Sequence, residues 1–547
     1  MADTLRMPAA TSHPRGASPF DRLTPFGFGT GLLVVCGCML VSFLLAGFWF
    51  PYWRVADMDF WVVYNAFLLN TPLPQEYFGH PGYLSILLLS YWLRALHAVG
   101  FVHVDSLAGI PPVSDVTGFA DAWMRATQAG RVLSLILAMT YVVTFSYLLR
   151  AIVRDGRVAG LAGFLLAFSG GLTMQMRIMR TELLAAGLFM VALLLLILVA
   201  KRGEWAWRSA AIGFASLLIT LGMLNKIQVF FLICALPVLL LPFGPDTTAP
   251  QGGFWRRRGA WLAAAASAAV ALLATYLARD ILIVGFSPLQ TPALYLPTLR
   301  IGASIYLPAF AIWIGLGMAA YWAVWRPAAA ETLAAMFAVV AGCMLGLLAL
   351  YARYDPNNVL VIFHPIEQMF QWAATAEPDL ANDASRLGFL LRSIGGVIAR
   401  RTFILHTSSR PAIFLEWFVI AATIVAIRRR EWRLVLQVVP LMLTDWCVDT
   451  LSMGRGLKQE YFNLTDPLAI IAAGLLIAKL VDLQYHRWTY RLGALLIAVH
   501  AVISQLEPIK NAAFKKSGPE VWCGLYPYAP RVEHFPLCPP PRPRSSG

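Results

Sequence analysis

Two carboxylates, Asp57 and Asp59, stand directly after the first long apolar run, in Arg54-Val-Ala-Asp-Met-Asp-Phe-Trp. A carboxylate at such a place can act as a general base and take the proton of an attacking hydroxyl group. In a helix, residues i and i+2 point about 200° apart, so the two side chains cannot both face one reacting atom. We favour Asp59, because it precedes a run, 62–69, expected to form an amphipathic helix, whose dipole keeps a carboxylate ionised. Asp57 is the alternative base, or it orients Arg54 or a metal. In the simplest interpretation, both carboxylates are only polar residues at the membrane interface.

Basic residues recur at the ends of apolar runs that lie far apart in the sequence. Those that we single out are Arg177 and Arg180 with the neighbouring Glu182, then Lys226, and finally Arg455 and Lys458 with the neighbouring Tyr461. Ionisable residues at membrane depth are costly, so they either pair with local carboxylates or hold an anion together. His80 stands before Pro81 and Gly82, at the start of an apolar helix, 83–99; a helix-start signal with an incidental histidine is the simpler interpretation. We expect at least two of the basic residues to reach one anion, with His80 and Tyr461 lining the same cavity.

The composition indicates which elements must position these residues. Of 547 residues, 59% are hydrophobic and 13% are charged, whereas soluble domains carry about 25% charged residues. The chain is therefore predicted to be an all-α, polytopic membrane protein. Its net charge of +14 would indicate nucleic acid in a soluble protein. Here it follows in part from basic cytoplasmic loops, so we expect no nucleic-acid partner.

The apolar runs predict about 13 transmembrane helices, the first of them from residue 28 to 50. With the amino terminus in the cytoplasm, every cytoplasmic turn is basic, which supports both the count and the direction. Counting 83–99 as a further span would reverse this pattern, so we expect it to lie at the outer interface. The expected parts are a cytoplasmic tail, 1–27, a transmembrane domain, 28–505, with periplasmic loops at 51–130 and 352–410, and a Pro-rich periplasmic tail, 506–547. We therefore expect a multi-pass protein of the bacterial inner membrane, with its carboxyl terminus in the periplasm.

Seven cysteines are present, and five of them lie in or beside apolar runs, where a small buried hydrophobic residue is expected. The other two, Cys523 and Cys538, lie in the polar tail. Because the periplasm is oxidising, we predict that these two form a disulfide.

In their layout, these motifs resemble the C-type (GT-C fold) glycosyltransferases that use polyprenyl-phosphate sugars, among them the bacterial aminoarabinose transferase and the protein O-mannosyltransferases. The likeness rests on the acidic pair after the first span, on His80-Pro-Gly, on Arg177-Ile-Met-Arg-Thr-Glu, on Asn225-Lys226 and on Lys458-Gln-Glu-Tyr-Phe. One departure is that the family's adjacent acidic residues are separated here by Met58.

The resemblance implies inverting transfer of a sugar from a polyprenyl-phosphate donor to a hydroxyl group of a glycan, lipid or protein acceptor on the periplasmic face. It implies an outer-loop Asp as the base, with Arg and Lys stabilising the departing lipid phosphate. No cofactor is expected, no metal ligands are assigned, and metal assistance is left open. We expect a monomer surrounded by membrane lipids.

Three other functions compete with this one. A transporter or flippase would show paired repeats and broken helices at the bilayer midplane, and we find neither in the sequence. A lipid-linked polysaccharide ligase or polymerase would rely on Arg and His in the loop 352–410. A membrane scaffold without catalysis is the simplest alternative.

Overall fold

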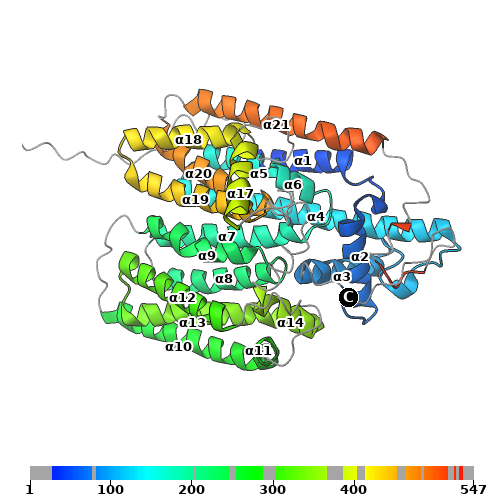
Figure 1. The fold of residues 1–547 in the computed structure, drawn as a ribbon, viewed down its shortest axis with the longest axis horizontal. Helices are drawn as coiled ribbons and strands as arrows, with labels where there is room; N and C mark the ends of the chain where they lie inside the picture. The colour runs from blue at the N-terminus through cyan, green and yellow to red at the C-terminus, as the bar shows by residue number, and fades with distance from the viewer. Residues whose placement is uncertain are drawn as a thin grey trace, which may run out of the picture.

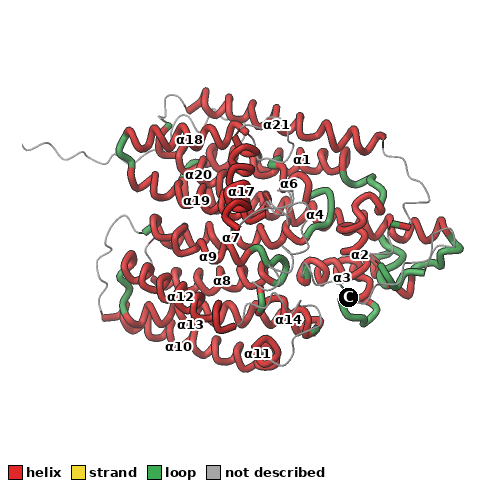
Figure 2. The backbone as a smooth tube through the Cα atoms, viewed as in Figure 1, coloured by secondary structure: helices red, strands yellow, loops and turns green. Residues whose placement is uncertain are grey.

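The computed structural model describes residues 27–76, 82–202, 205–244, 254–286, 303–365, 386–402, 413–452, 462–481, 486–514, 523–524 and 529–533. Within these ranges every regular element is a helix, as Figures 1 and 2 show. The all-α prediction is therefore confirmed.

Seven of the described helices are long and apolar enough to cross a membrane. They are α1 (Phe28–Ala46), α4 (Val116–Val153), α7 (Thr181–Arg202), α10 (Phe254–Leu277), α12 (Ala303–Trp325), α13 (Ala329–Leu347) and α20 (Phe462–Leu480). Other helices in the bundle include α5 (Gly156–Ala167), α8 (Trp205–Met223), α9 (Val229–Leu240), α18 (Ile413–Arg428), α19 (Trp432–Ser452) and α21 (His486–Phe514). The chain is thus a multi-pass membrane protein, while the count of thirteen spans stays a prediction.

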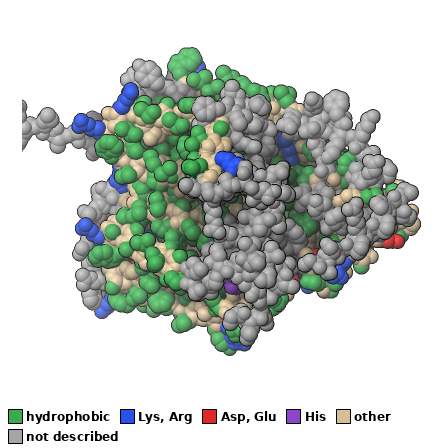
Figure 3. Space-filling model, in the orientation of Figure 1, with side chains coloured by type: hydrophobic (Ala, Val, Ile, Leu, Met, Phe, Trp, Pro, Cys, Tyr) green, Lys and Arg blue, Asp and Glu red, His purple; other side chains and the backbone are tan. Residues whose placement is uncertain are grey.

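Basic turns gather at one end of the bundle, which we call the basic end. Three non-glycine residues in these turns, Arg154, Arg326 and Arg430, have positive φ angles of 59°, 42° and 60°. This left-handed conformation ends a helix, and a cation there interacts favourably with the negative end of the helix dipole. The turns after α12 and α18 lie at the left of Figure 2, where Figure 3 shows Lys and Arg along the edge of a largely hydrophobic surface.

The opposite end of the bundle, which we call the loop end, carries α2 (Trp61–Asn70) and α3 (Tyr83–Ala98). These helices and the start of α4 enclose an apolar core separate from that of the bundle. The expectation that 62–69 is amphipathic is wrong, because residues 61–69 are buried on all sides. The polar atoms of Tyr64 and Asn65 have partners inside the protein, since Tyr64 donates to Glu76 and Asn65 donates to the carbonyl of Trp61.

Candidate active site

A buried ion pair ties the acidic segment after the first span to the helix bundle. Asp59 lies in a single π-helical turn (Ala56–Phe60), and its partner Arg131 lies in α4. Arg131 Nη2 and Nε are 2.6 and 2.9 Å from Asp59 Oδ2, and neither side chain has exposed area. The second oxygen, Oδ1, accepts a hydrogen bond of 2.7 Å from the backbone N–H of Met179. Both oxygens of Asp59 therefore have donors.

Arg131 also fixes the chain between α1 and Asp59. Its guanidinium donates to three backbone carbonyls, those of Gly47, Phe50 and Pro51. Burial raises the pKa of the Asp59 carboxyl, and the charge of Arg131 opposes that rise. Sequence reasoning missed Arg131, although an arginine at the start of an apolar run is itself a signal.

The turn that contains Met179, residues 176–180, connects α6 (Gly170–Gln175) to α7 and carries two of the predicted arginines. Arg177 is 4% exposed, and its Nη2 donates to Ser42 Oγ at 2.8 Å and to Gln505 Oε1. Both partners are neutral, and burial lowers the pKa of the Arg177 guanidinium to about 10. Arg177 therefore points toward α1 and α21.

Arg180 points toward a different group of charges. Lys226 Nζ is 2.6 Å from Glu182 Oε1, and Arg180 Nε is 3.5 Å from Glu182 Oε2. All three side chains are buried. Two buried cations thus contact one carboxylate. Arg180 also borders a cavity of about 20 Å³, room for about one water molecule.

Asn225, next to Lys226, joins this group to the start of α3. Its carbonyl accepts from the N–H of Gly82 at 3.0 Å, and its side-chain oxygen accepts from the N–H of Ser85 at 2.9 Å. The side-chain amide donates to the carbonyl of Thr181 at 2.7 Å. Gly82 has a φ of 56°, a left-handed conformation that favours glycine.

The structure therefore brings together several segments that the sequence singled out. Asp59, the turn 176–180, Glu182, Lys226 and the start of α3 form one continuous buried group. His80, Arg455, Lys458, Tyr461 and Cys538 lie outside the described residues, as does the side chain of Asp57. Contact of Arg177, Arg180 or Lys226 with a donor phosphate stays a prediction.

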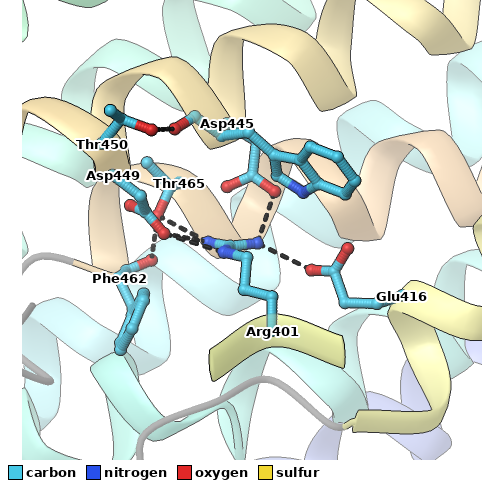
Figure 4. A network of polar contacts seen from close by, with 8 residues as sticks. Arg401, Glu416, Asp445, Asp449, Thr450, Phe462 and Thr465 are labelled. Carbon is cyan, nitrogen blue, oxygen red and sulfur yellow. Dashed lines mark hydrogen bonds and ion pairs between the residues drawn. The ribbon is translucent and has the colours of Figure 1, made fainter. Parts of the chain in front are cut away.

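A second buried charge cluster, missed by sequence reasoning, surrounds Arg401 at the end of α17 (Arg386–Thr402) (Figure 4). Arg401 Nη1 is 2.7 Å from Glu416 Oε1 and 2.6 Å from Asp445 Oδ2. Its Nε donates to Asp449 Oδ2 at 2.8 Å, and its Nη2 donates to Thr465 Oγ1 at 3.3 Å. The cluster ties α17 to α18, α19 and α20. The available signal was single acidic residues inside apolar runs.

The described part of the carboxyl-terminal tail lies on the loop end. Arg531 pairs with Glu76, and its backbone N–H donates to the hydroxyl of Tyr64 at 3.2 Å. Glu533 accepts from the N–H of Val113 at 3.1 Å. Cys523 is disulfide-bonded; its pairing with Cys538 stays a prediction. The helix α21 continues to Phe514, beyond residue 505, where we expected the tail to begin.

Among the residues described, no group of three or more His, Cys, Asp and Glu side chains is arranged to hold a metal ion.

No protein-family model matches the sequence, and no curated protein matches it. Among solved structures, the chain is similar to the crystal structure of the Archaeoglobus fulgidus oligosaccharyltransferase in complex with Zn and sulfate, with a TM-score of 0.39 and 14% sequence identity. The match covers 90% of this chain and 54% of that chain, so this chain spans about half the length of that protein.

Proposed function

We propose that this chain transfers a sugar from a polyprenyl-phosphate donor to an acceptor hydroxyl group, with inversion at the anomeric carbon. The reaction takes place at the loop end, which faces the periplasm of a bacterial inner membrane, and the acceptor is a glycan, a lipid or a protein. The observation that carries the proposal is the group of buried cations at this end. Arg180 and Lys226 share one carboxylate, and Arg177 has neutral partners.

Such a transfer needs cations that stabilise the leaving phosphate and a base that takes the proton of the acceptor. The acceptor oxygen attacks the anomeric carbon while the bond from that carbon to the phosphate oxygen breaks. The bonding electron pair stays on the phosphate, where Arg180 and Lys226 stabilise the new negative charge. The acceptor's proton passes to a carboxylate, which acts as the general base.

We assign the base to Asp57 and a positioning role to Asp59. Both oxygens of Asp59 accept hydrogen bonds, from Arg131 and Met179, and its side chain is buried. A carboxylate in this state has little capacity left for the proton of a substrate. Asp57, two residues earlier in the same π-helical turn, is the other carboxylate of the segment. Asp59, which the sequence favoured, is the alternative base.

The experiment reconstitutes the full chain in vesicles with polyprenyl-phosphate sugars and an envelope extract as the source of acceptors. We expect mass spectrometry to detect free polyprenyl phosphate, and Arg180→Gln to reduce its release by a factor of about 10². Arg125→Gln is the control, because Arg125 forms an ion pair with Asp121 in which both side chains are about half exposed. Transfer from a nucleotide sugar or from a lipid diphosphate, with none from the monophosphate donor, would contradict the proposal.

A further inference from the structure

A second feature of the structure lies away from the charged group of the loop end. It is an apolar cavity of about 230 Å³ between α5, α18, α20 and α21. Its walls include Leu161, Leu165, Phe418, Ala473 and Gly493, and the polar side chains of its lining are Arg157 and Tyr490. An apolar cavity of about 150 Å³ already accommodates benzene, so this one has room for a longer hydrocarbon.

The cavity has a polar end and an apolar end. Arg157 is the second residue of α5, and Tyr490 lies in the first turns of α21, so both stand at the basic end of the bundle. From Arg157 to Leu165 the lining of α5 extends for eight residues, which is about 12 Å along a helix. The shape is that of a groove that runs from the basic end into the hydrophobic interior.

Two further arginines, Arg150 and Arg491, lie beside residues that line the cavity at the basic end. Arg150 Nε lies 3.6 Å from the position that a Cβ of Gly156 would occupy at the start of α5. Arg491, next to Tyr490, lies over the ring of Trp488 at 5.6 Å. Asp155, which precedes α5, accepts from the N–H groups of Arg157 and Val158 and thereby caps α5. Basic pockets between membrane helices on the cytoplasmic side bind anionic lipid headgroups.

We propose that this cavity binds one acyl chain of an anionic phospholipid from the leaflet at the basic end, with its phosphate at Arg157 and Tyr490. The apolar walls accept the hydrocarbon, and Arg157 selects the negative headgroup. The site is independent of the proposed sugar transfer, because it opens at the end of the bundle opposite Arg180 and Lys226.

The test uses the full chain, purified in detergent and depleted of lipid, with phosphatidylglycerol, phosphatidylcholine or polyprenyl phosphate added separately. Native mass spectrometry counts the retained lipid. We expect phosphatidylglycerol to be retained at concentrations at least tenfold lower than phosphatidylcholine. Arg157→Gln should remove this preference.

Filling the cavity provides the second arm of the test. A Cβ at Gly493 would meet Leu161 Cδ1 at an ordinary 3.5 Å, so Gly493→Leu places its side chain in the cavity and should abolish retention. Ala473→Leu fills it from α20 and serves if the first variant does not fold. The matched control is Gly160→Leu, since a Cβ at Gly160 meets nothing within 4 Å. Wild-type retention by both filled variants, equal retention of the two phospholipids, or loss of polyprenyl-phosphate retention in both filled variants would each overturn the proposal.

Discussion

Asp59 and Arg131 lie 72 positions apart in the sequence and form an ion pair of 2.6 Å between side chains that have no exposed area. The pair joins the segment after the first span to the middle of α4. The guanidinium of Arg131 also donates hydrogen bonds to the carbonyls of Gly47, Phe50 and Pro51. The position of the acidic segment is therefore set by α4, and that of the turn 176–180 follows through Met179.

The first prediction concerns this pair. Arg131→Met leaves the buried Asp59 without its counter-charge, so we expect a loss of about 3–5 kcal/mol in the free energy of unfolding. Thermal or denaturant unfolding of the detergent-solubilised protein measures it. Arg125→Met, in the exposed Arg125–Asp121 pair of the same helix, should change stability by less than about 1 kcal/mol. Equal effects of the two replacements would refute a structural role for the buried pair.

The second prediction concerns Lys226. Lys226→Met removes the cation at 2.6 Å from Glu182 and leaves Arg180 at 3.5 Å. We expect transfer to fall by a factor of about 10² or more, as is typical when a donor to developing negative charge is removed. The double variant Lys226→Met with Glu182→Gln should regain stability without regaining activity. If the double variant regains activity as well, Lys226 acts only as a partner of Glu182.

The third prediction is a pH dependence. Burial lowers the pKa of Arg177 to about 10, so the guanidinium is charged at neutral pH and loses its proton as pH rises through that value. An anion held by Arg177 binds the charged form, and we expect the affinity for polyprenyl phosphate to fall between about pH 9 and 11. Arg177→Gln should bind more weakly at pH 8 and lose the part of the pH dependence that Arg177 contributes. A binding curve with the same slope in both proteins would exclude Arg177 from the phosphate site.

The same pKa shift predicts the sign of a stability change. Between the lowered pKa of folded Arg177 and its ordinary value, the unfolded chain binds a proton that the folded chain has released. The contribution of Arg177 to the free energy of unfolding therefore increases with pH in this interval. Arg177→Gln should remove that increase.

The fourth prediction concerns the cluster in Figure 4. Three carboxylates, those of Glu416, Asp445 and Asp449, share the guanidinium of Arg401. Arg401→Met leaves buried acidic groups without a cation, and we expect a loss of about 3–5 kcal/mol. Asp445→Asn lowers the excess of negative charge and should cost much less. The comparison is made by thermal unfolding, and a larger loss in Asp445→Asn would contradict this account.

Three of the residues that the sequence singled out, Arg180, Glu182 and Lys226, lie together in the structure, whereas their role in binding a donor phosphate stays a prediction. Arg180, Glu182 and Lys226 each stand at the end of an apolar run, and charged groups at the same depth pair because leaving them unpaired is costly. Arg131 also stands beside an apolar run, but its partner Asp59 lies 72 positions away and no pattern in the sequence connects the two. The partners of Arg401 come from α18, α19 and α20, and the contacts between these helices follow from packing that periodicity does not show.

For the helix α2, the burial of its residues could not be predicted from the sequence. In the run 62–69, which we expected to be amphipathic, Tyr64 and Asn65 are the polar residues, but both make hydrogen bonds inside the protein. A polar residue whose partners lie within the fold can be buried on any face of a helix. The sequence therefore predicted the existence of this helix but not its surroundings.

The last prediction separates the two carboxylates after the first span. Asp57→Asn removes the proposed base and hardly changes shape, so transfer should be abolished while polyprenyl-phosphate binding is retained. Asp59→Asn keeps a hydrogen-bond acceptor for Met179 but loses the charge that pairs with Arg131, so both stability and transfer should fall. Asp59→Glu keeps the charge and should restore part of the stability and part of the transfer. If Asp59 acted only as the base, the longer side chain would misplace the carboxylate and transfer would not return. Turnover and unfolding are measured on the same preparations. Transfer abolished in Asp59→Asn at unchanged stability, with normal transfer in Asp57→Asn, would assign the base to Asp59, and full activity in both Asn variants would end this mechanism for the chain.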